Sequence, residues 1–201
     1  MELNIRELIS GSPSRLRYVW RFSTSRVQHP ESVAEHSYYV CLYALLIGEW
    51  CISSATCDKM IDLQNLLRRA IVHDLEEAKS GDFPRLFKHS KPELKKLLDA
   101  VSLTAFSQLM HDVVDHTTAM KYNRIWEDAK DETPEGRILE FADFLCVLGF
   151  FNHEHEGGNR TVHNHIQDMQ GYFHIFHDKR FDFIRPLVDQ SSLLMQEIFN
   201  D

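Results

Sequence analysis

The chain has 201 residues, of which 43% are hydrophobic and 26% charged, a composition that is typical of a globular protein and argues against disorder. A formal net charge of −8 excludes nucleic acid as the expected partner, because binding to a phosphate backbone needs a clustered positive face. The sequence has neither an apolar run that could span a membrane nor the pattern of a signal peptide, so we expect a cytoplasmic protein without membrane contact.

The first part of the chain is predicted to form short helices, a loop and then a long helix. Short apolar stretches within residues 2–20 predict one or two short helices, and the polar, proline-ended residues 23–30 predict a loop. Ser32 and Glu35 fit a capping box, with Ser32 as N-cap. This box opens a helix over residues 33–51 that is apolar nearly all round, so we expect it to be central.

The next predicted helix carries the most distinctive stretch of the chain, His-Asp-Leu-Glu-Glu at residues 73–77. Asp58 can cap this helix, and apolar residues from Leu63 to Ile71 follow the spacing of one helix face. Gly81 stands where a C′ glycine is expected. The pattern therefore predicts one continuous helix that contains residues 73–77 and ends at Gly81.

The remaining elements are also predicted to be helical. Helices are expected over residues 92–116, 134–156, 160–177 and 183–199, with a proline in the first turn of the first two and the glycine pair at residues 157–158 ending the second. The chain shows no alternating strand pattern of useful length and no repeat. The predicted fold class is therefore all-α, a compact helical bundle in a single domain.

Most cysteines and histidines are given structural roles. The four cysteines lack C-x-x-C spacing and mostly lie in apolar helical context, which favours structural thiols over disulfides or zinc ligands. The histidines of residues 153–165 adjoin a glycine pair and are interpreted as surface residues. His174 and His177, three residues apart on the next predicted helix, could chelate an adventitious ion but lie outside the metal motif. Phenylalanines late in the chain are expected to pack in the core or in a dimer interface.

His73 and Asp74 form an adjacent pair that suits a divalent metal ion. An ion that activates water needs imidazole and carboxylate ligands and a position left for solvent. Adjacent helical residues point in different directions, so further ligands have to come from other helices; His36 and Asp143 are the candidates. Asp143 lies in an apolar run, where an unpaired charge would be costly to bury, and Glu77 lies one helical turn after His73.

The order His36, His73-Asp74, Asp143 resembles the HD-domain phosphohydrolase superfamily. Further matches are similar to the bacterial 5′-deoxynucleotidases within it, which are dimeric, metal-dependent enzymes that cleave phosphate from deoxynucleoside 5′-monophosphates. The resemblance covers residues 14–160, and residues 160–199 match in helical character only. It is carried by Arg21, Val33-x-Glu35-His36-Ser37, His73-Asp74-x-x-Glu77, Gly81-Asp82-x-Pro84 and Phe141-Ala142-Asp143.

The resemblance implies a metal centre and a catalytic pair. His36, His73, Asp74 and Asp143 would hold one divalent ion, which could be Co, Mn, Fe, Zn or Mg. Asp74 and Glu77 would be the catalytic residues. Glu77 would orient or deprotonate the attacking water, or protonate the leaving 5′-oxygen.

The resemblance also implies a site for a small deoxynucleotide. Arg21 would bind the phosphate, Asp82 the sugar 3′-hydroxyl, and Ser80 would add a polar contact nearby. Phe22 stands where the family typically has a tryptophan that crowds the sugar 2′-position. Because the phenylalanine ring has a shorter reach, we expect weaker rejection of ribonucleotides. Glu127 matches a family carboxylate near the site only after a one-residue shift.

Two further carboxylates are given structural interpretations. Glu35 is assigned to the capping box rather than to catalysis, and Glu76 is expected to be solvated or paired with Arg68 or Arg69.

The main prediction is a homodimeric phosphohydrolase of deoxynucleoside 5′-monophosphates. The alternative is a deoxynucleoside triphosphate triphosphohydrolase of the same superfamily, and a remote alternative is a non-catalytic, nucleotide-binding HD domain that keeps the metal as a structural element. Arg21, Glu77 and Asp82 disfavour the remote alternative, because a metal-stabilised domain does not need them. Cations that could bind further phosphates of a triphosphate are Arg26, Lys79, Arg85 and Lys88.

Overall fold

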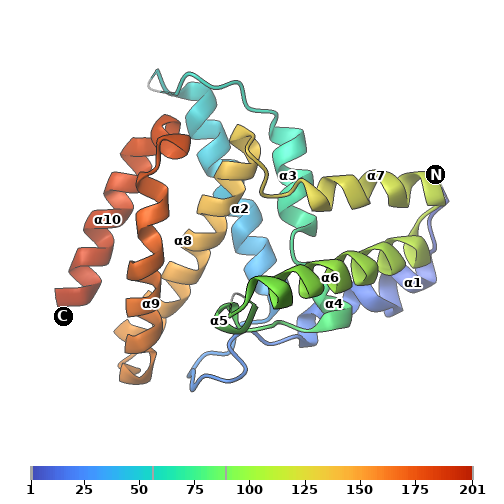
Figure 1. Cartoon of the computed structure of the whole chain (residues 1–201), viewed down its shortest axis with the longest axis horizontal. Helices are drawn as coiled ribbons and strands as arrows, with labels where there is room; N and C mark the ends of the chain where they lie inside the picture. The colour runs from blue at the N-terminus through green and yellow to red at the C-terminus, as the bar shows by residue number, and fades with distance from the viewer. Residues whose placement is uncertain (1, 56, 89, 201) are drawn as a thin grey trace. The chain divides into compact units, whose positions relative to one another are not determined.

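The computed structural model describes residues 2–55, 57–88 and 90–200, and its helices belong to two compact units (Figure 1). The described residues form α-helices and short 3-10 helices, with two isolated β-bridges and no strand, which confirms the all-α prediction. The first unit comprises Met1–Ser25, Pro30–Tyr38 and Arg68–Ala129, and the second comprises Arg26–His29, Tyr39–Leu67 and Lys130–Asp201.

The first unit is built around the long helix α6 (Pro92–Val113), which runs beside α1 (Ile5–Ser10) and α7 (His116–Glu127) (Figure 1). Its core is apolar, and within it the rings of Phe106 and Trp126 stack with centroids 5.4 Å apart. The other elements of this unit are the 3-10 helix η1 (Ser12–Tyr18), α4 (Glu77–Ser80), α5 (Arg85–Lys88), and parts of α2 (Val33–Ser53) and α3 (Leu63–Val72).

The second unit contains α8 (Pro134–Glu156), which lies beside α9 (His163–Phe173). Buried aromatic rings fill its core, as predicted for the late phenylalanines; Phe176 alone contacts Phe141, Phe144, Phe173 and Phe181 at centroid distances of 4.9–5.9 Å. Its other elements are η2 (Arg160–Val162), η3 (His174–His177), η4 (Lys179–Ile184), α10 (Arg185–Asn200), and the remaining parts of α2 and α3.

The capping box at the start of α2 is confirmed. The Glu35 backbone N–H donates to Ser32 Oγ at 3.2 Å, and the Ser32 backbone N–H donates to Glu35 Oε2 at 2.8 Å. These reciprocal bonds satisfy backbone donors that the first turn of a helix leaves unpaired, and they fix where α2 begins. His36 consequently lies in the first turn of α2.

The prediction of one continuous helix through residues 73–77 is wrong, because α3 ends at Val72 and a turn precedes α4. His73 Nδ1 donates to the Ala70 carbonyl at 2.7 Å, and in a continuing α-helix that carbonyl would accept from the Asp74 N–H. The Glu77 N–H bonds to the Asp74 carbonyl, so the turn has three-residue spacing. Asp74, rather than His73, is therefore the residue beside Glu77.

Two other helix boundaries also differ from the sequence prediction. Asp62, not Asp58, caps α3, because its Oδ1 accepts from the Asn65 backbone N–H at 3.0 Å. The helix expected to run to residue 116 ends at Val113, and α7, which was not predicted, follows it. Asp115 is the N-cap of α7 and accepts from the Thr118 N–H at 3.0 Å.

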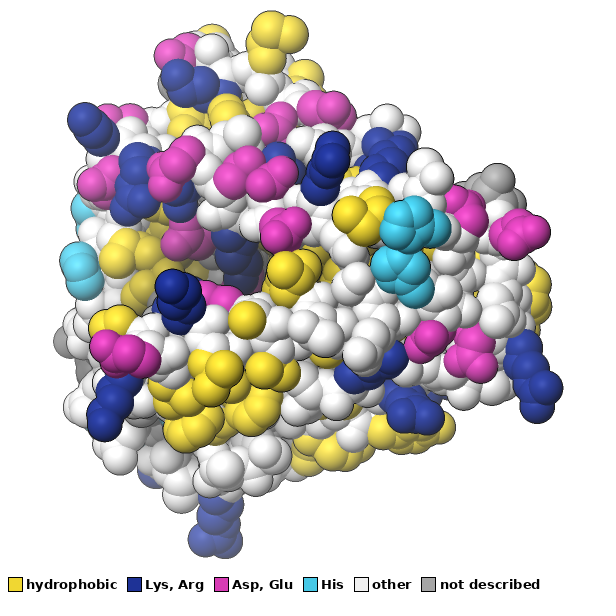
Figure 2. Space-filling view, turned by 45° about the vertical axis from the view of Figure 1, so that its right-hand side comes forward, with side chains coloured by type: hydrophobic (Ala, Val, Ile, Leu, Met, Phe, Trp, Pro, Cys, Tyr) yellow, Lys and Arg dark blue, Asp and Glu magenta, His cyan; other side chains and the backbone are white. Residues whose placement is uncertain are grey.

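Two further features concern the length of the helices and the charges on the surface. Within the part of the chain that the structure describes, no helix is both long and apolar enough to cross a membrane. Figure 2 shows acidic and basic side chains intermingled over the face in view rather than gathered by sign.

Candidate metal centre and active site

A short antiparallel contact brings Arg21 to the beginning of α2. The Arg21 N–H donates to the Glu31 carbonyl and the Val33 N–H donates to the Val19 carbonyl, each at 2.9 Å. Between these bonds, Trp20 and Ser32 form an isolated β-bridge. The pairing therefore positions the Arg21 guanidinium next to the first turn of α2, which carries His36.

Three of the four predicted metal ligands come together in the first unit. The Nε2 atom of His73 lies 3.1 Å from Asp74 Oδ2, and the Nε2 atom of His36 lies 3.6 Å from the same oxygen. Both imidazoles are buried. His73 donates from Nδ1 to a backbone carbonyl, so Nε2 is the nitrogen that can bind a metal.

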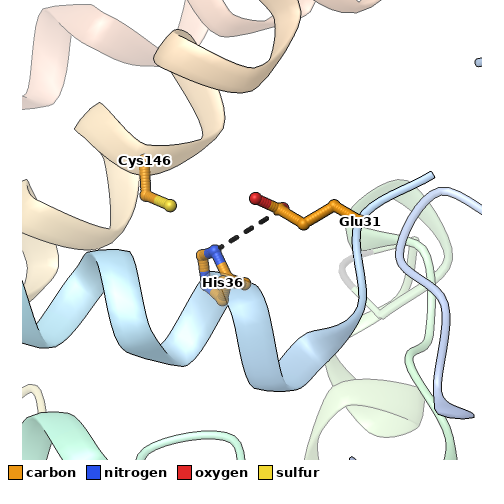
Figure 3. Close-up of side chains that lie close together, drawn as sticks. All are labelled: Glu31, His36 and Cys146. Carbon is orange, nitrogen blue, oxygen red and sulfur yellow. Dashed lines mark ion pairs between the residues drawn. The ribbon is translucent and has the colours of Figure 1, made fainter. Parts of the chain in front are cut away.

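This donor set fits a single divalent ion. Imidazole and carboxylate ligands bind Zn²⁺ and similar ions at about 2.0–2.2 Å, which places neighbouring donor atoms roughly 3 Å apart. The Nε2 atoms of His36 and His73 approach this spacing, since they lie 3.6 and 3.1 Å from Asp74 Oδ2, and all three donor atoms lie within 4.8 Å of one another. Figure 3 shows the Glu31 carboxylate pointing toward the His36 ring, and its Oε2 lies 4.0 Å from Nδ1. The carboxylate is thus an ion-pairing neighbour of His36.

Arg21 bridges the metal ligands and the sugar-binding candidates. Its Nη1 atom lies 3.6 Å from Asp74 Oδ2, and its Nε atom lies 3.6 Å from Glu31 Oε2. The guanidinium carbon lies 5.3 Å from the Phe22 ring centroid, a cation–π distance. Phe22 has a φ of 52°, a left-handed conformation that is rare for an aromatic residue and often marks functional sites. Its backbone N–H donates to Asp82.

Glu77 is buried beside Asp74 and has one oxygen available for a ligand. Its Oε1 atom accepts from Lys88 Nζ at 3.3 Å, whereas Oε2 is buried and has no hydrogen-bond partner among the described residues. Burial, followed by the negative charges of Asp74 and Asp82, raises the pKa of Glu77 to about 9. Burial also raises the pKa of Asp82, although the nearby Arg21 and Lys88 oppose it.

The prediction for Glu76 is wrong. Its side chain is buried, and Oε2 accepts from Trp126 Nε1 at 2.9 Å instead of facing solvent or an arginine. Arg69 Nη1 donates to the Asp128 carbonyl at 2.7 Å. Burial, followed by repulsion from Asp74, raises the pKa of Glu76 to about 7.

The remaining candidates from the sequence have varied surroundings. Ser80 Oγ donates to the Glu76 and Gly81 carbonyls at 3.3 and 3.2 Å, and Ser80 lines a groove of about 450 Å³ between α4 and α6.

Glu127 is exposed at the end of α7. Asp143 belongs to the second unit, where its Oδ2 accepts from Lys130 Nζ at 2.5 Å. The assignment of Asp143 as the fourth ligand stays a prediction.

Four basic residues are candidates for binding the additional phosphates of a triphosphate, and the structure places them differently. Lys88 contacts Glu77, whereas Lys79 Nζ donates to Asp112 Oδ2 at 3.1 Å. Arg26 belongs to the second unit, and the side chain of Arg85 lies outside the described part of the structure. Lys88 is therefore the cation of this group that is seen at the candidate site.

The late histidines are partly as predicted. His153 and His163 are exposed, whereas His155 and His165 are half-buried, and the His165 ring stacks on Phe151 at 5.0 Å. His153 and His155 lie in the last turn of α8. These histidines belong to the second unit and have contacts there that need no metal.

Sequence reasoning missed Glu31 and gave Trp126 no role. The only sequence signal for Glu31 is its place between a proline and the N-cap of α2, which does not reveal its contacts with Arg21 and His36. Trp126 lies fifty residues from Glu76 in sequence, so their hydrogen bond has no local signature.

Comparison with known proteins supports the resemblance seen in the sequence. A 5′-deoxynucleotidase of Dictyostelium discoideum is 26% identical over 164 residues, covering 74% of this chain and 78% of that protein. A crystal structure of an HD-domain phosphohydrolase from Listeria innocua matches with a TM-score of 0.78 at 22% identity, covering 95% of this chain and 89% of that one. The second match shows a shared fold.

A phage enzyme is a further relative. A dATP triphosphohydrolase of cyanophage S-2L is 28% identical over 152 residues, covering 74% of this chain and 77% of that protein. The structure of an HD phosphohydrolase of this phage, bound to dA and one catalytic Zn²⁺ ion, matches with a TM-score of 0.59 at 19% identity and covers 94% and 96% of the two chains. The model of the 5′-deoxynucleotidase YfbR-like family matches residues 11–183, and the chain belongs to that family.

Proposed function

We propose that this hydrolase removes phosphate from deoxynucleoside 5′-monophosphates with the help of a divalent metal ion. The observation that carries the proposal is the convergence of His36 Nε2 and His73 Nε2 on Asp74 Oδ2, with the Arg21 guanidinium 3.6 Å from the same oxygen. Metal ligands and a phosphate-binding cation are thus adjacent. In the reaction, the oxygen of water forms a bond to phosphorus, and the bond from phosphorus to the 5′-oxygen breaks.

His36, His73 and Asp74 would hold the ion, with Asp143 as the proposed fourth ligand. When bound, a divalent ion supplies Lewis-acid chemistry, since it stabilises charge on phosphoryl oxygens and lowers the pKa of water. Two imidazoles in the donor set favour Mn, Fe, Co or Zn over Mg, which prefers oxygen ligands. Glu31 would keep the His36 ring oriented.

The other side chains would bind the substrate and move a proton. Arg21 would bind the phosphate with its planar guanidinium, and Asp82 would accept the 3′-hydroxyl of the sugar. Phe22, which joins these two residues through its ring and its backbone N–H, would contact the sugar. Glu77 would hold or transfer a proton at Oε2, the oxygen without a partner among the described residues.

A product profile tests this function. The protein is loaded with Mn²⁺ or Co²⁺ and incubated with panels of deoxynucleoside monophosphates and triphosphates. We expect inorganic phosphate and the deoxynucleoside to form from the monophosphates. Release of triphosphate from a deoxynucleoside triphosphate would overturn the proposal in favour of an activity like that of the phage relative. A metal-dependent melting temperature without turnover would indicate a non-catalytic nucleotide-binding domain.

We also propose that the enzyme acts as a homodimer, as the family resemblance implies, and that it is located in the cytoplasm. Sedimentation-velocity measurement of the mass in solution tests the first part, and a single monomeric species at micromolar concentration would contradict it. Fractionation of the source cells tests the second part.

A further inference from the structure

Lys88 is a second basic side chain at the candidate site, besides Arg21. The proposed roles of the metal ligands and of Arg21 do not explain why a lysine is placed there. Its Nζ atom lies 3.3 Å from Glu77 Oε1, and about a third of its side chain is exposed while that of Glu77 is buried. Lys88 therefore contacts a buried carboxyl through Nζ while part of its side chain is exposed. Burial lowers the pKa of Lys88, but the carboxylates of Glu77, Asp74 and Asp82 outweigh burial and raise it, so Lys88 stays charged.

The acidic side chains of the site would repel a bound phosphate, so a second basic side chain would help to bind it. Asp74, Glu76, Glu77 and Asp82 place four acidic groups in the first unit near one another, and a phosphomonoester adds up to two further negative charges. Arg21 already contacts the carboxylates of Asp74 and Glu31. Lys88 contacts Glu77 instead, so the two basic side chains contact different acidic residues of the site.

We propose that Lys88 is a second phosphate-binding residue, whose ammonium donates to a non-bridging oxygen of the substrate phosphate while Arg21 binds another. The flexible stem of a lysine and its three donors allow Nζ to contact the phosphate and Glu77 Oε1 together. The role deepens the function proposed above and rests on it. It assigns Lys88 to the phosphate that every substrate of the enzyme carries, rather than to the additional phosphates of a triphosphate.

Inhibition by two fragments of the substrate tests this role. In the Mn²⁺-loaded enzyme, inorganic phosphate probes the phosphate site and deoxyadenosine probes the nucleoside site. For Lys88→Met, we expect the inhibition constant of phosphate to rise about 10- to 100-fold, the range for loss of a hydrogen bond to a charged group, while that of deoxyadenosine changes little. Lys88→Arg should restore most of the affinity for phosphate.

Lys79→Met is the matched control, because Lys79 pairs with Asp112 and has no contact with Glu77 in the structure. It should leave both inhibition constants unchanged. Equal loss of phosphate and deoxyadenosine affinity in Lys88→Met would indicate a purely structural role and overturn the proposal, as would unchanged phosphate affinity. If Lys88→Met does not fold, Lys88→Gln replaces it, since glutamine keeps a polar side chain but not the charge.

A double-mutant cycle separates direct binding from neutralisation of Glu77. If Lys88 contacts phosphate, Lys88→Met weakens phosphate binding also in a Glu77→Gln background. If Lys88 acts only by neutralising Glu77, that effect disappears, and the proposal fails. Phosphate binding can be measured by calorimetry without turnover. An enzyme that hydrolyses no monophosphate would therefore disprove the proposed function, whereas equal phosphate affinity of wild type and Lys88→Met would disprove only the role of Lys88.

Discussion

Glu77 is the residue on which proton transfer is proposed to depend, and its substitution gives a direct prediction. Glu77→Gln keeps the size of the side chain but cannot accept or release the proton, so we expect kcat to fall about 10²- to 10⁴-fold. Mn²⁺ affinity, measured by electron paramagnetic resonance, should stay close to that of wild type. Glu127→Gln, at the exposed end of α7, is the control and should leave kcat unchanged. An unchanged kcat in Glu77→Gln would remove Glu77 from the mechanism.

Phe22 stands where the family resemblance leads us to expect a tryptophan, and its environment predicts how sugar selectivity changes on substitution. Its left-handed backbone and its N–H bond to Asp82 fix where the ring begins, so a larger ring should extend farther toward the sugar. In Phe22→Trp we expect the ratio of kcat/KM for a deoxynucleotide to that for the ribonucleotide to rise about tenfold, the effect of roughly 1.4 kcal/mol. A ratio that falls or stays constant would mean that Phe22 does not face the 2′-position.

Gly81 ends α4 and sets the backbone direction into Asp82. Its φ of 76° and ψ of 164° are open almost only to glycine, and a Cβ there would meet no atom within 4 Å. Gly81→Ala should therefore lower the free energy of unfolding by about 1–3 kcal/mol through backbone strain alone. Urea denaturation measures this change.

Gly171→Ala in α9 is the matched control for Gly81→Ala. A Cβ added at Gly171 would likewise meet no atom within 4 Å, but the φ of this residue is not positive. Alanine in this helical context should raise stability by about 0.5–1 kcal/mol. Equal effects of the two substitutions would contradict the role assigned to the Gly81 backbone.

Helices with strong local signals could be predicted from the sequence, whereas boundaries set by side chains could not. The Ser32 and Glu35 box and the proline at the start of α8 are local features, and the structure has both. The break before His73 depends on a hydrogen bond from its ring to the Ala70 carbonyl, which the apolar periodicity of α3 conceals. The N-cap Asp115 was a usable local signal for α7.

Buried and capping carboxyls throughout the molecule predict how the free energy of unfolding varies with pH in the metal-free protein. Hydrogen bonds lower the pKa of Glu35, Asp115 and, despite burial, Glu154, so the unfolded chain takes up protons first and stability is lost as the pH falls below about 4.5. Glu76 and Glu77 have raised pKa values, so the unfolded chain loses protons first, and stability also declines as the pH rises from 4.5 toward 7 and 9.

The expected maximum of stability therefore lies near pH 4.5 when these groups dominate. Urea titrations of chelator-treated protein between pH 3 and 9 measure it. Glu76→Gln should flatten the alkaline side of the curve, because the amide does not titrate and can still accept from Trp126. Metal-free protein that becomes steadily more stable from pH 5 to 8 would contradict the assignment.

The candidate site was predictable in its residue types but not in its network. His36, His73 and Asp74 could be named from the sequence because few residue types bind metal ions, and the structure places their donor atoms together. Contacts such as Glu31 with Arg21 arise from tertiary pairing of the chain before α2 and have no spacing rule. The charge that Lys88 contributes could be named from the sequence, but not the carboxyl that it faces.

The end of α3 at Val72 has an electrostatic consequence for the order in which ligands bind. The carbonyl groups of a helix sum to about half a negative charge at its C-terminus, and this end of α3 directly precedes His73 and Asp74. The helix dipole thus adds to the carboxylates in attracting a cation and in repelling an anion. We expect detectable binding of inorganic phosphate only after the divalent ion has bound. Calorimetric titration of chelator-treated and Mn²⁺-loaded protein with phosphate checks this order. Equal phosphate affinity in both would show that the ion is not needed to overcome the repulsion by the helix dipole and the carboxylates.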